Sequence, residues 1–135
     1  MQRTALCSCG QLSVTMTGKP SYVAACSCFE CQKQTGSVFG VSSYWPKSAV
    51  VSIKGRKKLY RRSSWKGRWL DSYFCPTCGS CVYWYAEFDP DSIGISAGNF
   101  ADPDFEPPTY AVWDENRHPW VKFPKGCKLH KRQSR

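Results

Sequence analysis

Seven of the nine cysteines stand in short clusters whose spacing is typical of zinc ligands. They form a C-x-C pair, a C-x-x-C pair and a triplet within six residues, which are Cys7 and Cys9, Cys75 and Cys78, and Cys26, Cys28 and Cys31. Four thiolates complete the tetrahedral shell of Zn²⁺, whereas three leave one position open. Because a closed site stabilises a small fold and an open site can take a substrate atom, the clusters predict one structural zinc and one working zinc.

The C-x-x-C pair has the form of a zinc knuckle, followed by Gly79, which can take a positive φ without a side-chain clash. A knuckle supplies two ligands, and the C-x-C pair is the remaining two-cysteine cluster. Spacing leaves two alternatives open: the C-x-C pair could join the triplet, or Cys81 could extend the knuckle into a second triplet. Cys81 begins an apolar strand, where a cysteine is usually a small buried hydrophobe, so we expect it not to bind metal.

The triplet predicts chemistry on sulfur. Zn²⁺ with three thiolates carries a local charge of −1, which makes it a feeble Lewis acid towards water but a good host for a fourth soft ligand such as a substrate thiol. Coordination deprotonates a thiol and leaves the sulfur nucleophilic, so such a site can make or break carbon–sulfur bonds. In the alternative interpretation, a protein ligand completes this site and it too is structural.

A secreted disulfide framework is the other interpretation of nine cysteines in 135 residues. The odd count, the C-x-C and C-x-x-C spacings and the lack of an apolar run in the first residues all favour metal instead. No stretch approaches the ~20 apolar residues that cross a bilayer. We therefore expect a reduced protein of the cytoplasm without membrane contact.

Short apolar segments separated by Gly, Pro, Ser and Asp predict a mainly β fold that positions these clusters. The predicted strands cover residues 12–16, 22–25, 39–45, 50–53, 69–74, 82–85, 93–97 and 110–113. Little more than one helical turn is expected after the triplet, at Glu30–Gln34, ended by Gly36. Alternation around Leu59 is poor, and most of the rest of 89–108 is expected to be surface loop.

The chain divides into one zinc-binding domain, residues 1–124, and a basic tail, residues 125–135. The tail has hardly anything apolar to bury, so it is expected to be solvated and open to disorder. Its Cys127 and His130 are expected to be bystanders, because two ligands make at most a weak adventitious metal site.

Nineteen Lys and Arg residues stand against ten Asp and Glu residues, a formal net charge of +9. Binding of two Zn²⁺ by seven thiolates would contribute −3 and leave the protein at about +6. A basic balance of this size favours an anionic partner, either a small acidic substrate or a nucleic acid. The charge alone does not choose between them.

The motifs resemble those of the glutathione-dependent formaldehyde-activating enzyme (GFA) family, which also includes centromere protein V-like members. The likeness runs from about Cys7 to Trp120 and rests on Cys-x-Cys-Gly at 7–10, the triplet followed by Thr-Gly-Ser-x-Phe at 35–39, Phe-Cys-x-x-Cys-Gly-Ser at 74–80, and Ala-Gly-Asn-Phe at 97–100. It implies a single-domain β-tent fold of stacked antiparallel sheets built around a zinc-ribbon-like knuckle. It also implies a structural zinc on Cys7, Cys9, Cys75 and Cys78, and a catalytic zinc on Cys26, Cys28 and Cys31.

The family's named activity joins glutathione to formaldehyde, formally a carbon–sulfur lyase reaction run in reverse, and most members have no assigned substrate. The sequence departs from the family at Ser27, where many relatives carry a histidine between the first two cysteines of the triplet. A proton relay there would be lost. The metal itself would then activate the thiol, or the chain performs slower or different chemistry.

Contacts to an anionic, glutathione-like thiol are expected near the triplet and from basic residues. The candidates are Lys33, Thr35, Gly36, Phe39, His118 and the cations of residues 56–68. Phe39 also fits a core aromatic, and His118, before a proline, fits a structural turn residue. Charge runs such as 56–68 are usually solvated surface.

Two other functions fit the same residues. A carrier or sensor would bind glutathione or another thiol at the open zinc without turnover. A zinc-ribbon-like nucleic-acid-binding module is favoured by the charge and by Trp65, Trp69 and Tyr60 among basic residues. Against this module, an open metal position serves no purpose in a scaffold, and residues 56–68 resemble one amphipathic hairpin rather than a binding arm.

Overall fold

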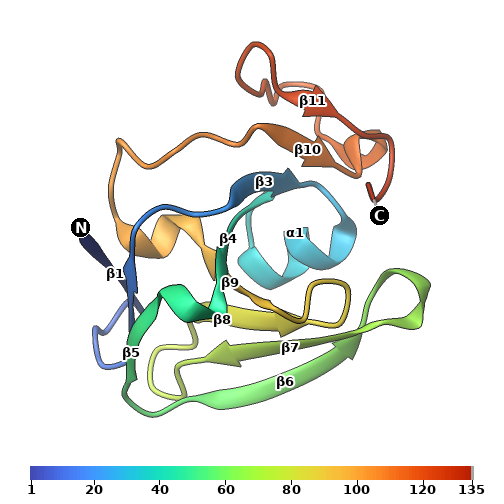
Figure 1. Ribbon diagram of the computed structural model, residues 1–135. Coiled ribbons are helices and arrows are strands. Elements are labelled where there is room, and N and C mark those ends of the chain that lie inside the picture. Colours follow the sequence, from blue (N-terminus) through green and yellow to red (C-terminus); the bar gives the residue numbers. More distant parts are fainter. Residues whose placement is uncertain (135) are drawn as a thin grey trace.

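Two β-sheets form the molecule, whose computed structural model describes residues 1–134 (Figure 1). The large sheet has the strand order β11-β10-β3-β4-β9-β8-β7-β6, and the small sheet has the order β1-β2-β5. The strands are β1 (Gln2–Leu6), β2 (Ser13–Thr17), β3 (Tyr22–Cys26), β4 (Gly40–Pro46), β5 (Val50–Lys54), β6 (Lys58–Ser63), β7 (Trp69–Phe74), β8 (Cys81–Ala86), β9 (Ser92–Ser96), β10 (Tyr110–Val112) and β11 (Lys128–Leu129). The prediction of a mainly β fold is confirmed.

Helical structure is short and lies in the connections. The α-helix α1 (Phe29–Thr35) follows β3, and four single-turn 3₁₀ helices connect strands: η1 (Lys47–Ala49), η2 (Trp65–Gly67), η3 (Ala97–Phe100) and η4 (Asp114–Asn116). In Figure 1, α1 lies between β3 and the β7–β9 part of the large sheet. The expected single turn after the triplet is thus nearly two turns long, and Gly36 ends it in the left-handed conformation (φ 69°), as predicted.

Most neighbouring strands are antiparallel, as expected, but one edge of the large sheet is parallel. β10 runs parallel to β3, pairing Val112 with Cys26, and also parallel to β11, pairing Tyr110 with Lys128. The tail predicted to be open to disorder therefore contributes a strand. That part of the prediction is wrong because backbone hydrogen bonds to β10 order the segment although Lys128 and Leu129 remain exposed.

The core lies where the small sheet covers the middle of the large one. Leu12, Val14 and Met16 are fully buried on the side of the small sheet, and Trp45 and Ile95 are fully buried on the large sheet. Val14 and Met16 alternate with half-buried neighbours, which is the period of two that predicted this strand. Truncating one of these aliphatic side chains to alanine costs about 2–5 kcal/mol.

Candidate functional site

Four cysteines from two distant turns converge at one point. Cys7 and Cys9 lie in the β1–β2 turn, and Cys75 and Cys78 lie in the β7–β8 turn. Their Sγ atoms all lie within 4.8 Å of one another. The Cys7–Cys9 and Cys9–Cys75 sulfur distances are 3.6 and 3.7 Å, close to the ~3.8 Å edge of a tetrahedron with Zn–S bonds of about 2.3 Å. The geometry therefore brings together the two pairs that spacing alone could not assign to each other.

Backbone N–H groups hold the two turns in shape. Gly79 N–H donates to the Cys75 carbonyl at 2.8 Å, and Gly10 N–H donates to the Cys7 carbonyl at 3.0 Å. Both glycines have φ near +80°, a conformation that side chains disfavour. In addition, Leu12 N–H points at the Cys7 sulfur (3.2 Å), which stabilises negative charge there. The turn at Gly79 is the one that the sequence predicted.

The three-cysteine cluster is built at the junction of β3 and α1. Cys26 is the last residue of β3, Cys28 is the N-cap of α1, and Cys31 lies in the first turn of the helix. Cys31 N–H donates to the Cys28 sulfur at 3.3 Å, so the helix cap itself aims this sulfur. The three Sγ atoms lie within 4.8 Å of one another, and each residue is half-buried.

The hydrogen bonds within this cluster favour one thiolate and disfavour the formation of a second. Hydrogen bonds from the Cys26 and Cys31 thiols lower the pKa of Cys28 to about 2. Sharing hydrogen bonds with Cys28 raises the pKa of Cys26 to about 12, and the pKa of Cys31 is raised by its neighbours Cys26 and Cys28. Three thiolates can therefore coexist here only beside a cation. The donor set fits a soft divalent ion such as Zn²⁺.

Neither cluster recruits a further ligand within the part of the chain that the structure describes. Among residues 1–134, the four-cysteine group and the three-cysteine group are the only sets of three or more Cys, His, Asp or Glu with converging ligand atoms. Cys81 belongs to neither set. Its half-buried sulfur accepts a hydrogen bond from Gln34 Nε2 (3.3 Å), and burial raises its pKa to about 11.

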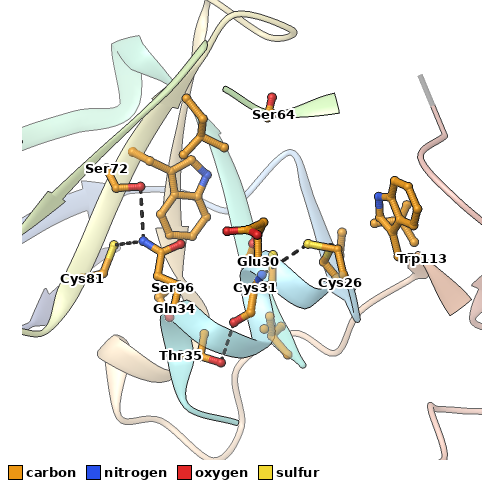
Figure 2. Close-up of a pocket in the computed structure, with 18 of the residues that line it drawn as sticks. Cys26, Glu30, Cys31, Gln34, Thr35, Ser64, Ser72, Cys81, Ser96 and Trp113 are labelled. Atoms are coloured by element: carbon orange, nitrogen blue, oxygen red, sulfur yellow. Dashed lines mark hydrogen bonds between the residues drawn. The ribbon is translucent and has the colours of Figure 1, made fainter. Parts of the chain in front are cut away.

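A cavity of about 860 Å³ opens onto the three-cysteine cluster. Cys26, Cys28 and Cys31 contribute to its wall, together with residues of β4, β8, the β6–β7 hairpin and the segment after β10. Figure 2 shows Gln34 of α1 reaching across to Ser72 and Cys81 on neighbouring strands. This volume is within the range of sites that bind molecules of drug size.

The sequence matches the family model described as "Glutathione-dependent formaldehyde-activating enzyme" over residues 2–116. This span contains both cysteine clusters and the whole of α1. The chain belongs to the GFA family. The likeness inferred from the cysteine motifs is thereby confirmed.

A relative and a solved structure extend the comparison. An Emericella nidulans protein named "Putative glutathione-dependent formaldehyde-activating enzyme" is 29% identical over 89 residues, which is 66% of this chain and 44% of that protein. The chain therefore spans less than half the length of this GFA relative. The crystal structure of a Rhodobacter sphaeroides protein covers 77% of this chain and 91% of its own, with a TM-score of 0.56 and 17% identity. That likeness shows a shared fold.

The substrate contacts expected from the sequence are dispersed in the structure. Thr35 lines the cavity, and its hydroxyl donates to the Cys31 carbonyl at 2.8 Å. Lys33 is exposed, forms an ion pair with Glu30 (2.8 Å) and borders a smaller hollow instead. Gly36, Phe39 and His118 are not among the lining residues of the large cavity.

Packing explains where two of these residues lie. Phe39 packs edge-on against Phe123, with ring centroids 5.3 Å apart, and His118 contacts Trp120 in the same manner at 6.2 Å.

Cys127 and His130 belong to neither of the converging sets found in the described chain. No helix among residues 1–134 is long and apolar enough to cross a membrane.

Three cavity residues had no role in the sequence-based interpretation. They are Tyr44, Trp84 and Trp113, which all line the cavity. Tyr44 and Trp84 fell inside predicted strands, but which strands are neighbours cannot be read from periodicity. Arg62, one of the candidate cations of residues 56–68, also lines the cavity.

Proposed function

We propose that this GFA-family chain binds an anionic thiol of the glutathione type and adds it to, or releases it from, a small electrophile such as formaldehyde, as a carbon–sulfur lyase-like enzyme. The observation that carries the proposal is the three-cysteine cluster on the wall of the 860 Å³ cavity, to which the described residues add no fourth ligand. The four-cysteine cluster, by contrast, has a complete ligand set. One cluster thus suits a scaffold and the other suits chemistry.

Two zinc ions per chain fit these donor sets. Cys7, Cys9, Cys75 and Cys78 would hold the structural ion, and Cys26, Cys28 and Cys31 the working ion. When bound at the triplet, zinc supplies an open coordination position and lowers the pKa of a thiol that occupies it. Ser27, the residue between the first two cysteines, has a buried hydroxyl without a hydrogen-bond partner in the described chain. Ser27 therefore does not take over the proton relay that a histidine at this position would provide.

The cavity supplies proximity. It has room for a thiol and a small aldehyde together, and holding both reactants in one place can lower the barrier by several kcal/mol. Apolar and aromatic side chains make up much of its wall, including Val41, Leu70 and Trp84. Water is thereby kept from part of the surface around the reacting atoms.

Arg62 is the cation best placed for the carboxylate of an anionic thiol. It is half-buried, lines the cavity, and is close enough to Cys28 for its charge to favour the thiolate there. It forms no ion pair with a carboxylate among residues 1–134, whereas Lys33 is already paired with Glu30. An unpaired guanidinium is suited to bidentate carboxylate binding.

The test is exchange spectroscopy by NMR on the zinc-loaded protein, which measures the rate at which glutathione and formaldehyde form and lose their adduct. The wild type and Cys127→Ser, which alters a cysteine outside both clusters, should accelerate this exchange at equal protein concentration. Cys31→Ser should not. Thiol binding without any acceleration would contradict the enzymatic proposal and leave a carrier or sensor.

The nucleic-acid alternative loses part of its support. Trp65 packs against Trp113 (5.3 Å between ring centroids), and Arg61 lies over the ring of Trp69 at 5.2 Å, so these two rings already have partners. Tyr60 alone of the three is exposed, at 55%. A stacking platform needs several free rings along a groove.

A further inference from the structure

Tyr44, Gly94 and Trp84 stand in one row across three adjacent strands. Tyr44 of β4 pairs with Gly94 of β9, and the same glycine pairs with Trp84 of β8. Cross-strand partners share a face of the sheet, so the two aromatic side chains lie on either side of a residue that has none. A Cβ atom built on Gly94 would collide with Nε1 of the Trp84 indole. The glycine therefore provides the space through which the indole reaches Tyr44.

The indole fixes the direction of the Tyr44 hydroxyl. Trp84 Nε1 and the Tyr44 oxygen are 3.3 Å apart, and the indole N–H can only donate. The tyrosine oxygen is consequently the acceptor in this bond, and its own O–H remains able to donate to another atom. The phenol ring is held by Tyr22, stacked at 4.8 Å, and by Phe88, edge-on at 5.9 Å.

Tyr44 shares a cavity with the three-cysteine cluster. Tyr44 lines the same cavity as Cys26 and Cys31. Burial raises the pKa of Tyr44. The phenol accordingly stays neutral near pH 7, as a hydrogen-bond donor must.

Such a donor can assist the addition of a thiol to an aldehyde. The thiol first loses its proton to solvent, and a sulfur electron pair then forms the C–S bond while the C=O π pair moves onto oxygen. That oxygen carries a developing negative charge until it takes a proton from water, and the reverse reaction passes through the same charge distribution. A donor aimed at the oxygen stabilises the transition state.

We propose that the Tyr44 hydroxyl donates a hydrogen bond to the aldehyde oxygen during C–S bond formation, and that Trp84, lying across Gly94, orients it. This inference rests on the proposed function and assigns it a catalytic residue, Tyr44, and a positioning residue, Trp84. The departure at Ser27 leaves the triplet without an adjacent histidine. Tyr44, on the adjacent strand β4, would donate the hydrogen bond instead.

Tyr44→Phe removes the hydroxyl and keeps the ring. Removing one such donor lowers kcat by about 10²–10³-fold in other enzymes, and we expect a loss of about 10²-fold here with an unchanged KM. Trp84→Phe should lower kcat by a smaller factor, because the phenol remains but loses its orienting bond. The matched control is Tyr73→Phe, at a partly buried tyrosine whose ring stacks on Tyr83 (4.8 Å between centroids) and which is not among the cavity-lining residues. It should keep nearly full activity.

Thiol affinity, measured by calorimetry on each zinc-loaded variant, separates chemistry from binding and folding. The inference expects the same Kd for glutathione in wild type, Tyr44→Phe and Tyr73→Phe. An active wild type with an equally active Tyr44→Phe overturns the role of Tyr44 and leaves the proposed function intact. Equal losses in Tyr44→Phe and Tyr73→Phe overturn it as well, since the loss would then not depend on a hydroxyl in the cavity. A wild type that binds thiol without accelerating exchange overturns the proposed function itself.

Discussion

The Trp65 indole meets the Trp113 indole edge-on, with ring centroids 5.3 Å apart and an interplanar angle of 82°. Trp65 lies at the tip of the β6–β7 hairpin, and Trp113 follows β10, so the contact joins two segments from opposite halves of the large sheet. Both rings line the cavity, and Figure 2 places Trp113 on the side of Cys26 away from Gln34. The pair therefore closes one side of the cavity.

Trp65→Ala should weaken thiol binding without unfolding the protein. The substitution removes an edge-to-face contact worth about 0.5–1.5 kcal/mol beyond burial, so we expect KM for the thiol to rise several-fold. Hydrogen exchange should become faster in residues 63–69 and stay unchanged in β8 and β9. Trp120→Ala, at a ring that is 70% exposed, is the control and should leave KM as it is.

Metal content distinguishes the two clusters. Wild type should contain two zinc ions, and Cys31→Ser should give a folded protein with one, because α1 and the sheets keep their other contacts. Cys78→Ser should lose the fold, since structural zinc contributes directly to folding free energy. Mass spectrometry under native conditions and circular dichroism measure both outcomes. If the two variants unfold alike, the division into a structural and a working site is wrong.

Arg62→Gln should weaken the binding of thiols that carry a carboxylate. A hydrogen-bonded charge pair contributes roughly 1.5–3 kcal/mol, which corresponds to about a 10–100-fold rise in Kd for 3-mercaptopropionate. Cysteamine, which has no carboxylate, should bind both proteins alike. Lys58→Gln removes an equal charge from the exposed start of β6 and serves as the control. Equal effects of the two variants would indicate a general charge effect and no specific contact.

The Arg3–Glu106 ion pair should make stability depend on pH in acid. Two bonds of 2.6 and 2.7 Å join the guanidinium to the carboxylate, and the hydrogen bond from Arg3 lowers the pKa of Glu106 to about 2. Because the folded-state pKa lies below the ordinary carboxyl value, the stabilisation is present above about pH 4.5 and is lost as pH falls towards 2.

Glu106→Gln tests this pair by thermal denaturation. We expect the variant to be less stable by roughly 1–2 kcal/mol, because Arg3 is largely buried while Glu106 is partly exposed. The difference in stability between the variant and wild type should be constant between pH 7 and 5.5 and should become smaller below pH 5.5. Glu115→Gln, at the more exposed pair with Arg132, should change stability less. A difference in stability that stays constant down to pH 3 would contradict the lowered pKa of Glu106.

Local patterns predicted most of the fold. Alternation and turn residues located β2, β3, β4, β5, β7, β8, β9 and β10 to within two residues of their ends. β1 was missed because only Ala5 of Gln2–Leu6 is fully buried, which leaves no alternating apolar pattern. β6 shows poor alternation for the same reason, since five of its six residues are exposed and the strand forms one edge of the sheet.

The cysteine clusters were predictable because ligand spacing is a local property of the sequence. The cavity was not predictable, because its wall comes from segments that are distant in the sequence. Spacing did not show which pairs of cysteines converge. Cys9 and Cys75, which meet in the structure, lie in two turns and are 66 residues apart in the sequence. Tyr44 and Trp84 meet only because β9 lies between their strands and presents a glycine there. Such a relationship depends on strand order, which no period in the sequence encodes.

The four-cysteine cluster also bears on how the protein matures. Its halves lie in the β1–β2 and β7–β8 turns, so the proposed structural zinc could be fully enclosed only after more than half of the chain has left the ribosome. Closing so large a loop is entropically unfavourable, and a bound zinc would compensate for that cost. Cells starved of zinc should accordingly accumulate nascent chains that chaperones and proteases recognise, and supply of the ion would set how much finished protein they contain.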